Sequence, residues 1–338
     1  MSKKIQYRED KSISKKYKEL YLQGIEQIIA NREQSARIKR DNYSANIFQN
    51  QEQFREELQG MLGWPLSESQ ERTVPSTKIE EVSDEETYRI YRVTLEVLDG
   101  LEMTGLFFQK KEGVKPLVIV QHGGYGTPEL ISNFYGDTSN YNDMLERVLK
   151  EDVHVFAPQL LLWQCESYQV EHDRVNIDAR LKRVGSSITA LEVYAMIRIL
   201  DYFEAQEYVS NFGMVGFSYG GMYTLLTAAL DTRIKSAVSC SFFNTRGEIA
   251  WSDWTWFCSA EKFCDAEIAC LVYPRRLCIE VGVKDEFFSI EGARAEMRRL
   301  KEKCKEVGTD WLDYIEYDGI HEFCREDAPI KRLVKDIQ

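Results

Sequence analysis

The chain has 338 residues, of which 43% are hydrophobic and 12% are aromatic. That composition supports a sizeable core and argues against extensive disorder. The formal net charge of −12 at pH 7 argues against a nucleic acid or an anionic membrane as the main partner, because both require clustered Lys and Arg. A neutral or weakly charged small molecule fits this charge better.

The N-terminus and the cysteines predict a cytoplasmic protein. The first residues run into charged positions with no apolar segment behind them, and no apolar stretch approaches the roughly 20 residues that span a bilayer. The eight cysteines form neither a C-x-x-C pair nor a metal-ligand spacing, so we expect reduced thiols. The alternative is a secreted protein that has lost its leader, which the starting Met disfavours.

Residues 1–78 predict a helical extension. Apolar side chains recur there at helical spacing in two stripes, at Tyr17, Leu20, Tyr21, Gly24, Ile25 and Ile28 and at Phe54, Leu58, Met61 and Leu62. Because amphipathic helices usually bury one face, we favour helices that cover one side of the main domain. The alternatives are a dimer contact or a wall of the substrate cleft, and a homo-oligomer stays open.

Residues 79–338 predict one α/β domain. Alternation over 91–97, the turn Asp99-Gly100 and the return over 101–108 predict a hairpin. Short apolar runs then alternate with helical stretches, which indicates a mostly parallel, mixed eight-stranded sheet with helices on both faces. The apolar runs are 117–120, 153–157, 212–215, 234–239, 277–281 and 311–317, and the helical stretches lie near 141–151, 187–206, 219–230, 291–306 and 326–336.

Two insertions, 159–185 and 244–274, interrupt this alternation. Loops of this length inside an α/β domain are usually lids or binding loops, although surface decoration is the simpler alternative. The second insertion is rich in tryptophan, and aromatic side chains commonly line ligand pockets. We therefore expect Trp163 of the first insertion and Trp254 and Trp256 of the second to bind substrate.

The strongest functional signal is the G-x-S-x-G pattern of residues 216–220, which follows the apolar run 212–215 and opens a helical stretch. A serine in a sharp strand-to-helix turn needs neighbours without a Cβ, because the strand and the helix pass closely. The helix directs unpaired N–H groups toward the place where an oxyanion would form. These features predict a nucleophilic Ser218; the alternative is a serine in an ordinary glycine-rich turn.

A serine nucleophile needs a base, and the base needs a group that orients it. Of the four histidines, only His321 follows the last predicted strand, so it is the expected base. Asp285, in the loop after the strand 277–281, is the expected acid, with Glu286 as the reserve. Either acid could instead serve the N-terminus of the next helix. Glu280 interrupts that apolar strand without an evident reason.

An oxyanion hole requires two N–H groups near the developing negative charge. One is expected from Tyr219, directly after the serine. The other is expected from Gly124, with Tyr125 close behind, because the glycines at 123 and 124 let the backbone approach a ligand. His122 is then expected to hold this loop by a hydrogen bond.

These pieces together resemble the α/β-hydrolase superfamily, in particular its dienelactone hydrolase and acetyl xylan esterase branch. The resemblance covers residues 79 to 338 and is carried by 122–124, 216–221, 282–285 and 321–322. The helical leader and the stretch 263–276 also look like bacterial esterase-type members. The resemblance implies a triad of Ser218, Asp285 and His321 that hydrolyses an ester through an acyl-enzyme.

The chain departs from that branch in two ways. Dienelactone hydrolases carry a nucleophilic cysteine where this chain has Ser218, and the Arg-Gly-Gln motif of the carbohydrate acetyl esterases is missing from the loop 160–166. The expected function is therefore a serine carboxylesterase acting on a small or carbohydrate-linked acyl ester.

A peptidase of the prolyl oligopeptidase type and a non-catalytic hydrolase-fold binding protein are the alternatives. The first usually needs a propeller domain for which 78 leading residues are too few, and the second usually lacks a triad member. The expected mechanism requires neither a metal nor an organic cofactor.

Overall fold

The computed structural model describes residues 8–68, 73–163, 170–247, 249 and 251–338, and their strands form one mixed sheet. Its order is β1-β2-β3-β5-β4-β6-β7-β8-β9. In this spatial order, the pairs β1-β2, β2-β3 and β3-β5 are antiparallel, and every following pair, starting with β5-β4, is parallel. The strands are β1 (Thr77–Asp84), β2 (Tyr88–Leu98), β3 (Leu101–Lys110), β4 (Lys115–Gln121), β5 (His154–Pro158), β6 (Val209–Phe217), β7 (Ile234–Cys240), β8 (Arg276–Gly282) and β9 (Leu312–Tyr317).

The mixed α/β sheet is confirmed, but the expected count of eight strands is wrong, because the described sheet has nine. The additional strand is β1, which pairs with β2 at the edge of the sheet. None of its side chains is buried, so it lacks the apolar alternation by which a strand is recognised in a sequence. The expected boundary between residues 78 and 79 falls inside this strand.

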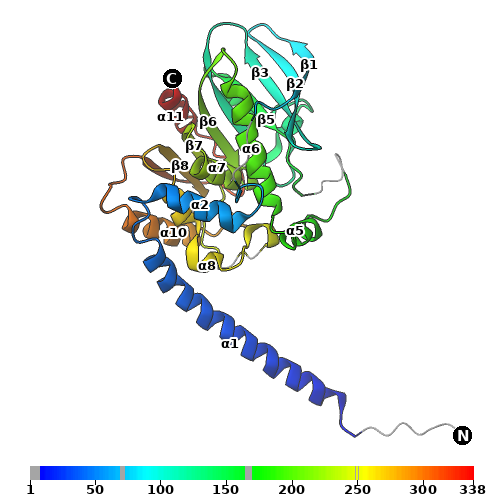
Figure 1. Ribbon diagram of the computed structural model, residues 1–338, viewed down its shortest axis with the longest axis vertical. Coiled ribbons are helices and arrows are strands. Elements are labelled where there is room, and N and C mark those ends of the chain that lie inside the picture. The colour runs from blue at the N-terminus through cyan, green and yellow to red at the C-terminus, as the bar shows by residue number, and fades with distance from the viewer. Residues whose placement is uncertain (1–7, 69–72, 164–169, 248, 250) are drawn as a thin grey trace, which may run out of the picture.

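Helices cover both faces of the sheet (Figure 1). Apolar residues of α2, α6, α7, α9 and α10 build the core on one face, and those of α4 and α11 build the core on the other. The helices are α1 (Lys11–Tyr43), α2 (Gln51–Leu62), α3 (Pro128–Ile131), α4 (Met144–Leu149), α5 (Arg174–Lys182), α6 (Ile188–Glu204), α7 (Tyr219–Leu230), α8 (Ser259–Lys262), α9 (Asp265–Cys270), α10 (Ile290–Lys303) and α11 (Ala328–Ile337), with short 3-10 turns η1 (Ser139–Tyr141) and η2 (Ser252–Trp254).

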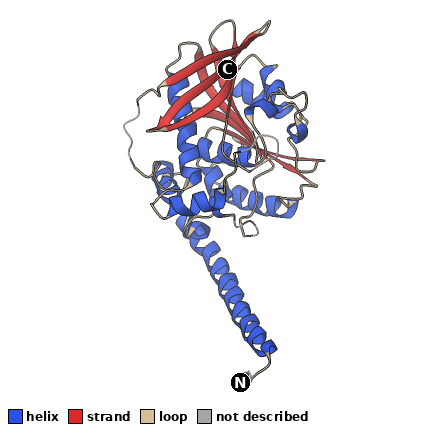
Figure 2. Ribbon diagram, turned by 90° about the vertical axis from the view of Figure 1, so that its right-hand side faces the viewer, coloured by secondary structure: helices blue, strands red, loops and turns tan. Residues whose placement is uncertain are grey.

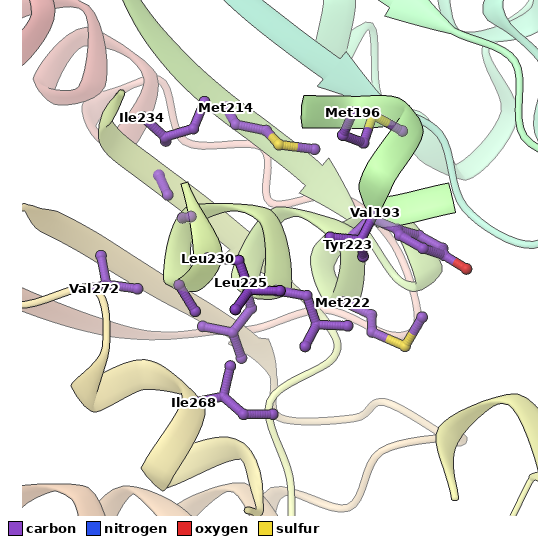
Figure 3. Packing of buried hydrophobic residues seen from close by; sticks show 14 of the residues in the cluster. Val193, Met196, Met214, Met222, Tyr223, Leu225, Leu230, Ile234, Ile268 and Val272 are labelled. Carbon is purple, nitrogen blue, oxygen red and sulfur yellow. The ribbon is translucent and has the colours of Figure 1, made fainter. Parts of the chain in front are cut away.

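The helix α7 lies at the centre of the larger core. All of its residues are buried, as expected for a helix that is apolar on every side. Figure 3 shows Leu225 and Leu230 of α7 among side chains from β6, β7, α6 and α9. Full burial of each such leucine stabilises the fold by roughly 1.5–3 kcal/mol. This packing fixes the position of the N-terminus of α7, where Ser218 lies.

The two N-terminal helices behave differently. We expected both to cover the main domain, and α2 does so: Phe54, Leu58 and Leu62 are buried, and Arg55 Nε donates to the carbonyl oxygen of Ala229 at 3.0 Å. For most of α1 the expectation is wrong. Its C-terminal third contacts α8, but the rest projects away from the body (Figures 1 and 2), and the stripe from Tyr17 to Ile28 is exposed.

The two insertions contact each other. Arg174 of α5 forms an ion pair with Asp253 of η2 at 2.7 Å, and Lys182 Nζ donates to the carbonyl oxygen of Thr255 at 2.7 Å. Within the described ranges, no helix is long and apolar enough to cross a bilayer. The seven cysteines in those ranges are free, and Cys165 lies outside them, as do the other residues of 164–166.

Candidate active site

Ser218 lies in a sharp turn between β6 and α7. Its φ of 58° and ψ of −121° are values that residues with a Cβ rarely adopt. The glycines on either side allow the turn: a Cβ at Gly216 would lie 2.1 Å from the Gly220 carbonyl oxygen, and one at Gly220 would lie 2.2 Å from the Gln121 carbonyl oxygen. The strand and the helix therefore pass as closely as the sequence predicted.

The imidazole of His321 lies between Ser218 and Asp285. Its Nε2 is 3.0 Å from Ser218 Oγ, and its Nδ1 is 2.9 Å from Asp285 Oδ2. The Asp285 side chain is 1% exposed, and its Oδ1 accepts from the backbone N–H groups of Phe287 and Phe288. The reserve acid, Glu286, instead accepts from the backbone N–H of His321 at 3.2 Å. The fold thus brings the three predicted side chains into hydrogen-bonding distance.

The loop that carries His321 is tied to the segment before α4. Asn140 Nδ2 donates to the carbonyl oxygen of His321 at 3.0 Å, and Asn142 Nδ2 donates to that of Phe323 at 2.7 Å. The rings of Phe217 and Phe287 each have their centroids 4.8 Å from that of the imidazole. Neither asparagine was predicted from the sequence, because polar loop residues far from any motif carry no recognisable signal.

The loop after β4 lies against Ser218. A Cβ at Gly123 would lie 3.1 Å from the Cβ of Ser218. His122 Nε2 accepts from the N–H of Leu160 at 3.1 Å, so its Nδ1 donates to the carbonyl oxygen of Gly123 at 2.9 Å. Burial lowers the pKa of His122 to about 4, which keeps the ring neutral at neutral pH. His122 therefore holds the loop in place, as expected.

Two backbone segments border the Ser218 hydroxyl. Tyr219 is the first residue of α7, so its N–H has no acceptor within the helix and lies at the positive end of the helix dipole. Gly124 belongs to the loop that abuts Ser218, and a Cβ there would lie 2.9 Å from the Trp163 ring. The loop lies this close to the Trp163 ring because residue 124 has no side chain.

An open cavity of about 1000 Å³ lies alongside Tyr219 and is bordered by both insertions. Tyr125, Trp163, Tyr219 and Trp251 form its aromatic wall. The Trp163 ring centroid is 5.1 Å from that of Tyr125 and 4.9 Å from that of Trp251. Aromatic walls of this kind bind the apolar faces of organic ligands.

A buried polar network fixes this wall from behind. Trp163 Nε1 donates to the hydroxyl of Tyr219 at 3.1 Å, and that hydroxyl donates to Asp253 at 3.0 Å. Arg174 lies between Asp253 and Glu192, at 2.7 and 2.8 Å. Because buried charges without partners are costly, this pairing holds the two insertions in one arrangement.

The three tryptophans expected to bind substrate lie in different environments. Trp163 lines the cavity that lies alongside Tyr219. Trp254 is buried, with its ring centroid 4.9 Å from that of Tyr219, and Trp256 lines a separate cavity together with residues of α1 and α10. The other tryptophan of the wall, Trp251, was not among the residues predicted to bind substrate. Tryptophan content alone does not distinguish a wall from the core behind it.

Comparison with known proteins finds a family similar to part of this chain. Residues 103–250 match the model of the dienelactone hydrolase family. This segment of the chain is similar to that family. Ser218 and the loop of Gly123 and Gly124 lie inside the matched segment, whereas Asp285 and His321 lie beyond its C-terminal end.

Three known proteins are similar to a larger part of the chain. A Bacillus subtilis protein, provisionally named the hydrolase YtaP, is 28% identical over 261 residues, which are 70% of this chain and 82% of that protein. A Bacteroides fragilis structure, provisionally named an acetyl xylan esterase, has a TM-score of 0.65 at 16% identity over 87% of this chain and 84% of its own. A glucuronoyl esterase from Solibacter usitatus has a TM-score of 0.58 at 16% identity over 85% and 91%. The structural likeness establishes the α/β-hydrolase fold.

One buried acid near the site, Glu280, forms no ion pair among the described residues. Glu280 of β8 is 1% exposed, and its Oε2 has no hydrogen-bond partner among the described residues. Burial raises the pKa of Glu280 to about 7, although hydrogen bonds with Cys240 and Cys324 lower it in part. The carboxyl is therefore protonated in mildly acidic solution and costly to ionise above neutrality.

The substitution Glu280→Gln should remove a pH-dependent part of the free energy of unfolding. Because the folded pKa lies above the unfolded one, the stability that the protonated carboxyl contributes is complete below about pH 4.5 and is lost as pH rises through 7. We compare the free energies of unfolding of the variant and of wild type, measured by urea unfolding at pH 5 and at pH 8. From the lower to the higher pH, this difference should shift in favour of the variant by up to about 3 kcal/mol. The matched control is Glu112→Gln at an exposed site, and an equal difference from wild type at both pH values would contradict this account.

Proposed function

We propose that this protein is a serine carboxylesterase, with Ser218 as nucleophile, His321 as general base and acid, and Asp285 as the group that orients the imidazole. The observation that carries the proposal is the chain of two short contacts from Ser218 Oγ to His321 Nε2 and from His321 Nδ1 to Asp285 Oδ2. The family match and the esterases among the structural relatives support a hydrolase that acts on esters.

The reaction follows from these contacts. Ser218 Oγ attacks the ester carbonyl carbon while its proton passes to His321 Nε2. The carbonyl oxygen becomes an oxyanion, which the N–H groups of Tyr219 and of Gly124 or Tyr125 would stabilise. Collapse of this intermediate breaks the bond to the alcohol oxygen, which takes the proton from His321. A water molecule, deprotonated by His321, then attacks the acyl-enzyme and releases the acid and free Ser218.

The aromatic wall suggests the leaving group. Tyr125, Trp163 and Trp251 present several rings in an open cavity rather than a narrow apolar tunnel. Sugar rings stack their C–H faces on such surfaces, whereas a long acyl chain needs an enclosed apolar channel. We therefore propose a short acyl group linked to a carbohydrate-like alcohol. The carbohydrate-ester names among the structural relatives agree with this choice.

Replacement of Ser218 or His321 by alanine should abolish hydrolysis of p-nitrophenyl acetate. Loss of the hydroxyl removes the nucleophile, and loss of the imidazole removes its base, so kcat should fall by about 10⁴-fold or more in each variant. Circular dichroism and thermal unfolding check that the fold is retained. Turnover close to wild type in either folded variant would refute the assignment.

Asp285→Asn should lower kcat by about 10²- to 10⁴-fold, because an amide no longer fixes the imidazole tautomer. Glu286→Gln is the matched control: its amide oxygen can still accept from the His321 N–H, so kcat should change less than about fivefold. The reverse order of the two effects would move the acid to Glu286.

The substrate class is tested at Trp251. Trp251→Ala should raise KM for an acetylated xylo-oligosaccharide by about tenfold through loss of ring stacking, while kcat/KM for p-nitrophenyl acetate stays within about twofold. The control is Trp256→Ala, because Trp256 lines a different cavity from the one that contains Trp251. An equal effect of Trp251→Ala on both esters would exclude the wall as a sugar-binding surface.

A further inference from the structure

The helix α1 leaves a long apolar face without a partner. It has 33 residues, which makes it about 50 Å long, and only Ala36 and Arg40 among them are buried. Side chains of Arg32, Lys39 and Arg40 pair with Glu261 and Glu267, so the body holds only the C-terminal part. Both views of the ribbon show the rest of α1 projecting from the body (Figures 1 and 2).

The projecting segment is strongly apolar. Tyr21 is 75% exposed and Ile28 is 63% exposed, and the other large apolar side chains exposed on it are Tyr17, Leu20, Leu22, Ile25 and Ile29. At 100° per residue these side chains occupy one broad side of the helix. Leu22, Ile25 and Ile29 continue the line of Ala36 and Arg40 that meets the body. A contiguous exposed apolar surface of this kind marks an interaction site.

Isolated helices are marginally stable in water and gain most of their stability from packing of an apolar face. A projecting helix with such a face therefore needs a partner. Gly24 lies within the stripe, and a Cβ there would have nothing within 4 Å, so a second helix could approach closely at that point.

We propose that α1 is a dimerisation arm whose apolar face packs against the α1 of a second copy of this chain. Charge complementarity selects this occupant. Residues 1–43 carry eleven Lys and Arg against six Asp and Glu, a net charge of +5, whereas the rest of the chain carries −17. The arm of one copy is thus attracted to the acidic body of another.

The distribution of charge along the arm sets its orientation. Lys11, Lys15, Lys16 and Lys18 lie at the free end, and a parallel pair would bring both sets together. An antiparallel pair about the middle of the stripe instead separates the two sets and brings each basic end to the place where the partner's α1 meets its acidic body. Such a pair is isologous, as expected for a two-fold dimer.

The same composition disfavours an anionic membrane as the occupant. Between residues 19 and 31, where the apolar side chains are densest, the helix has no Lys or Arg and carries Glu19 and Glu26. Helices that lie on anionic bilayers carry basic residues beside their apolar face.

The test is analytical ultracentrifugation of the full-length protein at micromolar concentration. The molecular mass measured for wild type should be twice the 39.4 kDa of one chain. The double variant Tyr21→Glu with Ile28→Glu should weaken the dimer by roughly a hundredfold or more, because both substitutions place charge in the apolar contact. The matched control, Gln23→Glu with Ala30→Glu, adds two charges to the opposite side of α1 and should leave the mass unchanged.

Three outcomes would overturn the proposal. They are a monomeric wild type, a dimer that the apolar-face variant leaves intact, and equal loss of the dimer in both variants. Co-sedimentation with vesicles of phosphatidylcholine and phosphatidylserine tests the other occupant, and a monomer whose α1 binds those vesicles would assign the face to a membrane. Thermal unfolding checks that the body stays folded, which is expected because all four positions are exposed.

Discussion

The close passage of β6, α7 and the loop after β4 is the constraint on which the rest of the site depends. It is possible only because Gly123, Gly216 and Gly220 have no Cβ, and it holds Ser218 at a φ of 58°. Burial of every residue of α7 opposes relaxation of that turn. The hydroxyl, the helix N-terminus and the proposed oxyanion loop therefore keep one arrangement before any substrate binds.

Tyr219 contacts both the turn that holds Ser218 and the aromatic cavity. Its backbone lies at the N-terminus of α7 next to Ser218, and its hydroxyl contacts Trp163 and Asp253 of the two insertions. The insertions are thus braced against a residue of the proposed oxyanion hole. Loss of the buried ion pairs of Arg174 would therefore disturb both the aromatic wall and the backbone next to Ser218.

Much of this could be predicted from the sequence because the signals are local. The apolar runs and the glycines around Ser218 depend on neighbours within a few residues, and the order of Ser218, Asp285 and His321 matches the order of the strands that carry them. β1 was not predicted because an exposed edge strand needs no apolar face. Asn140 and Asn142 were missed because their role exists only where the β9 loop meets the segment before α4.

The tryptophans and α1 show a second limit. Trp251 and Trp254 are three positions apart, yet one lines the cavity and the other is buried behind it, and only the packing of η2 distinguishes them. The periodicity of α1 correctly indicated an amphipathic helix, but no pattern within one chain says whether an apolar face meets its own body or another molecule.

Reaction of the protein with a fluorophosphonate probe, followed by mass spectrometry of the labelled peptide, tests the central claim most directly. The account predicts one covalent adduct on the Ser218 hydroxyl, with labelling slowed at least a hundredfold when His321 is replaced by alanine. An adduct on another residue, or labelling of Ser218 at an unchanged rate without the imidazole, would contradict it.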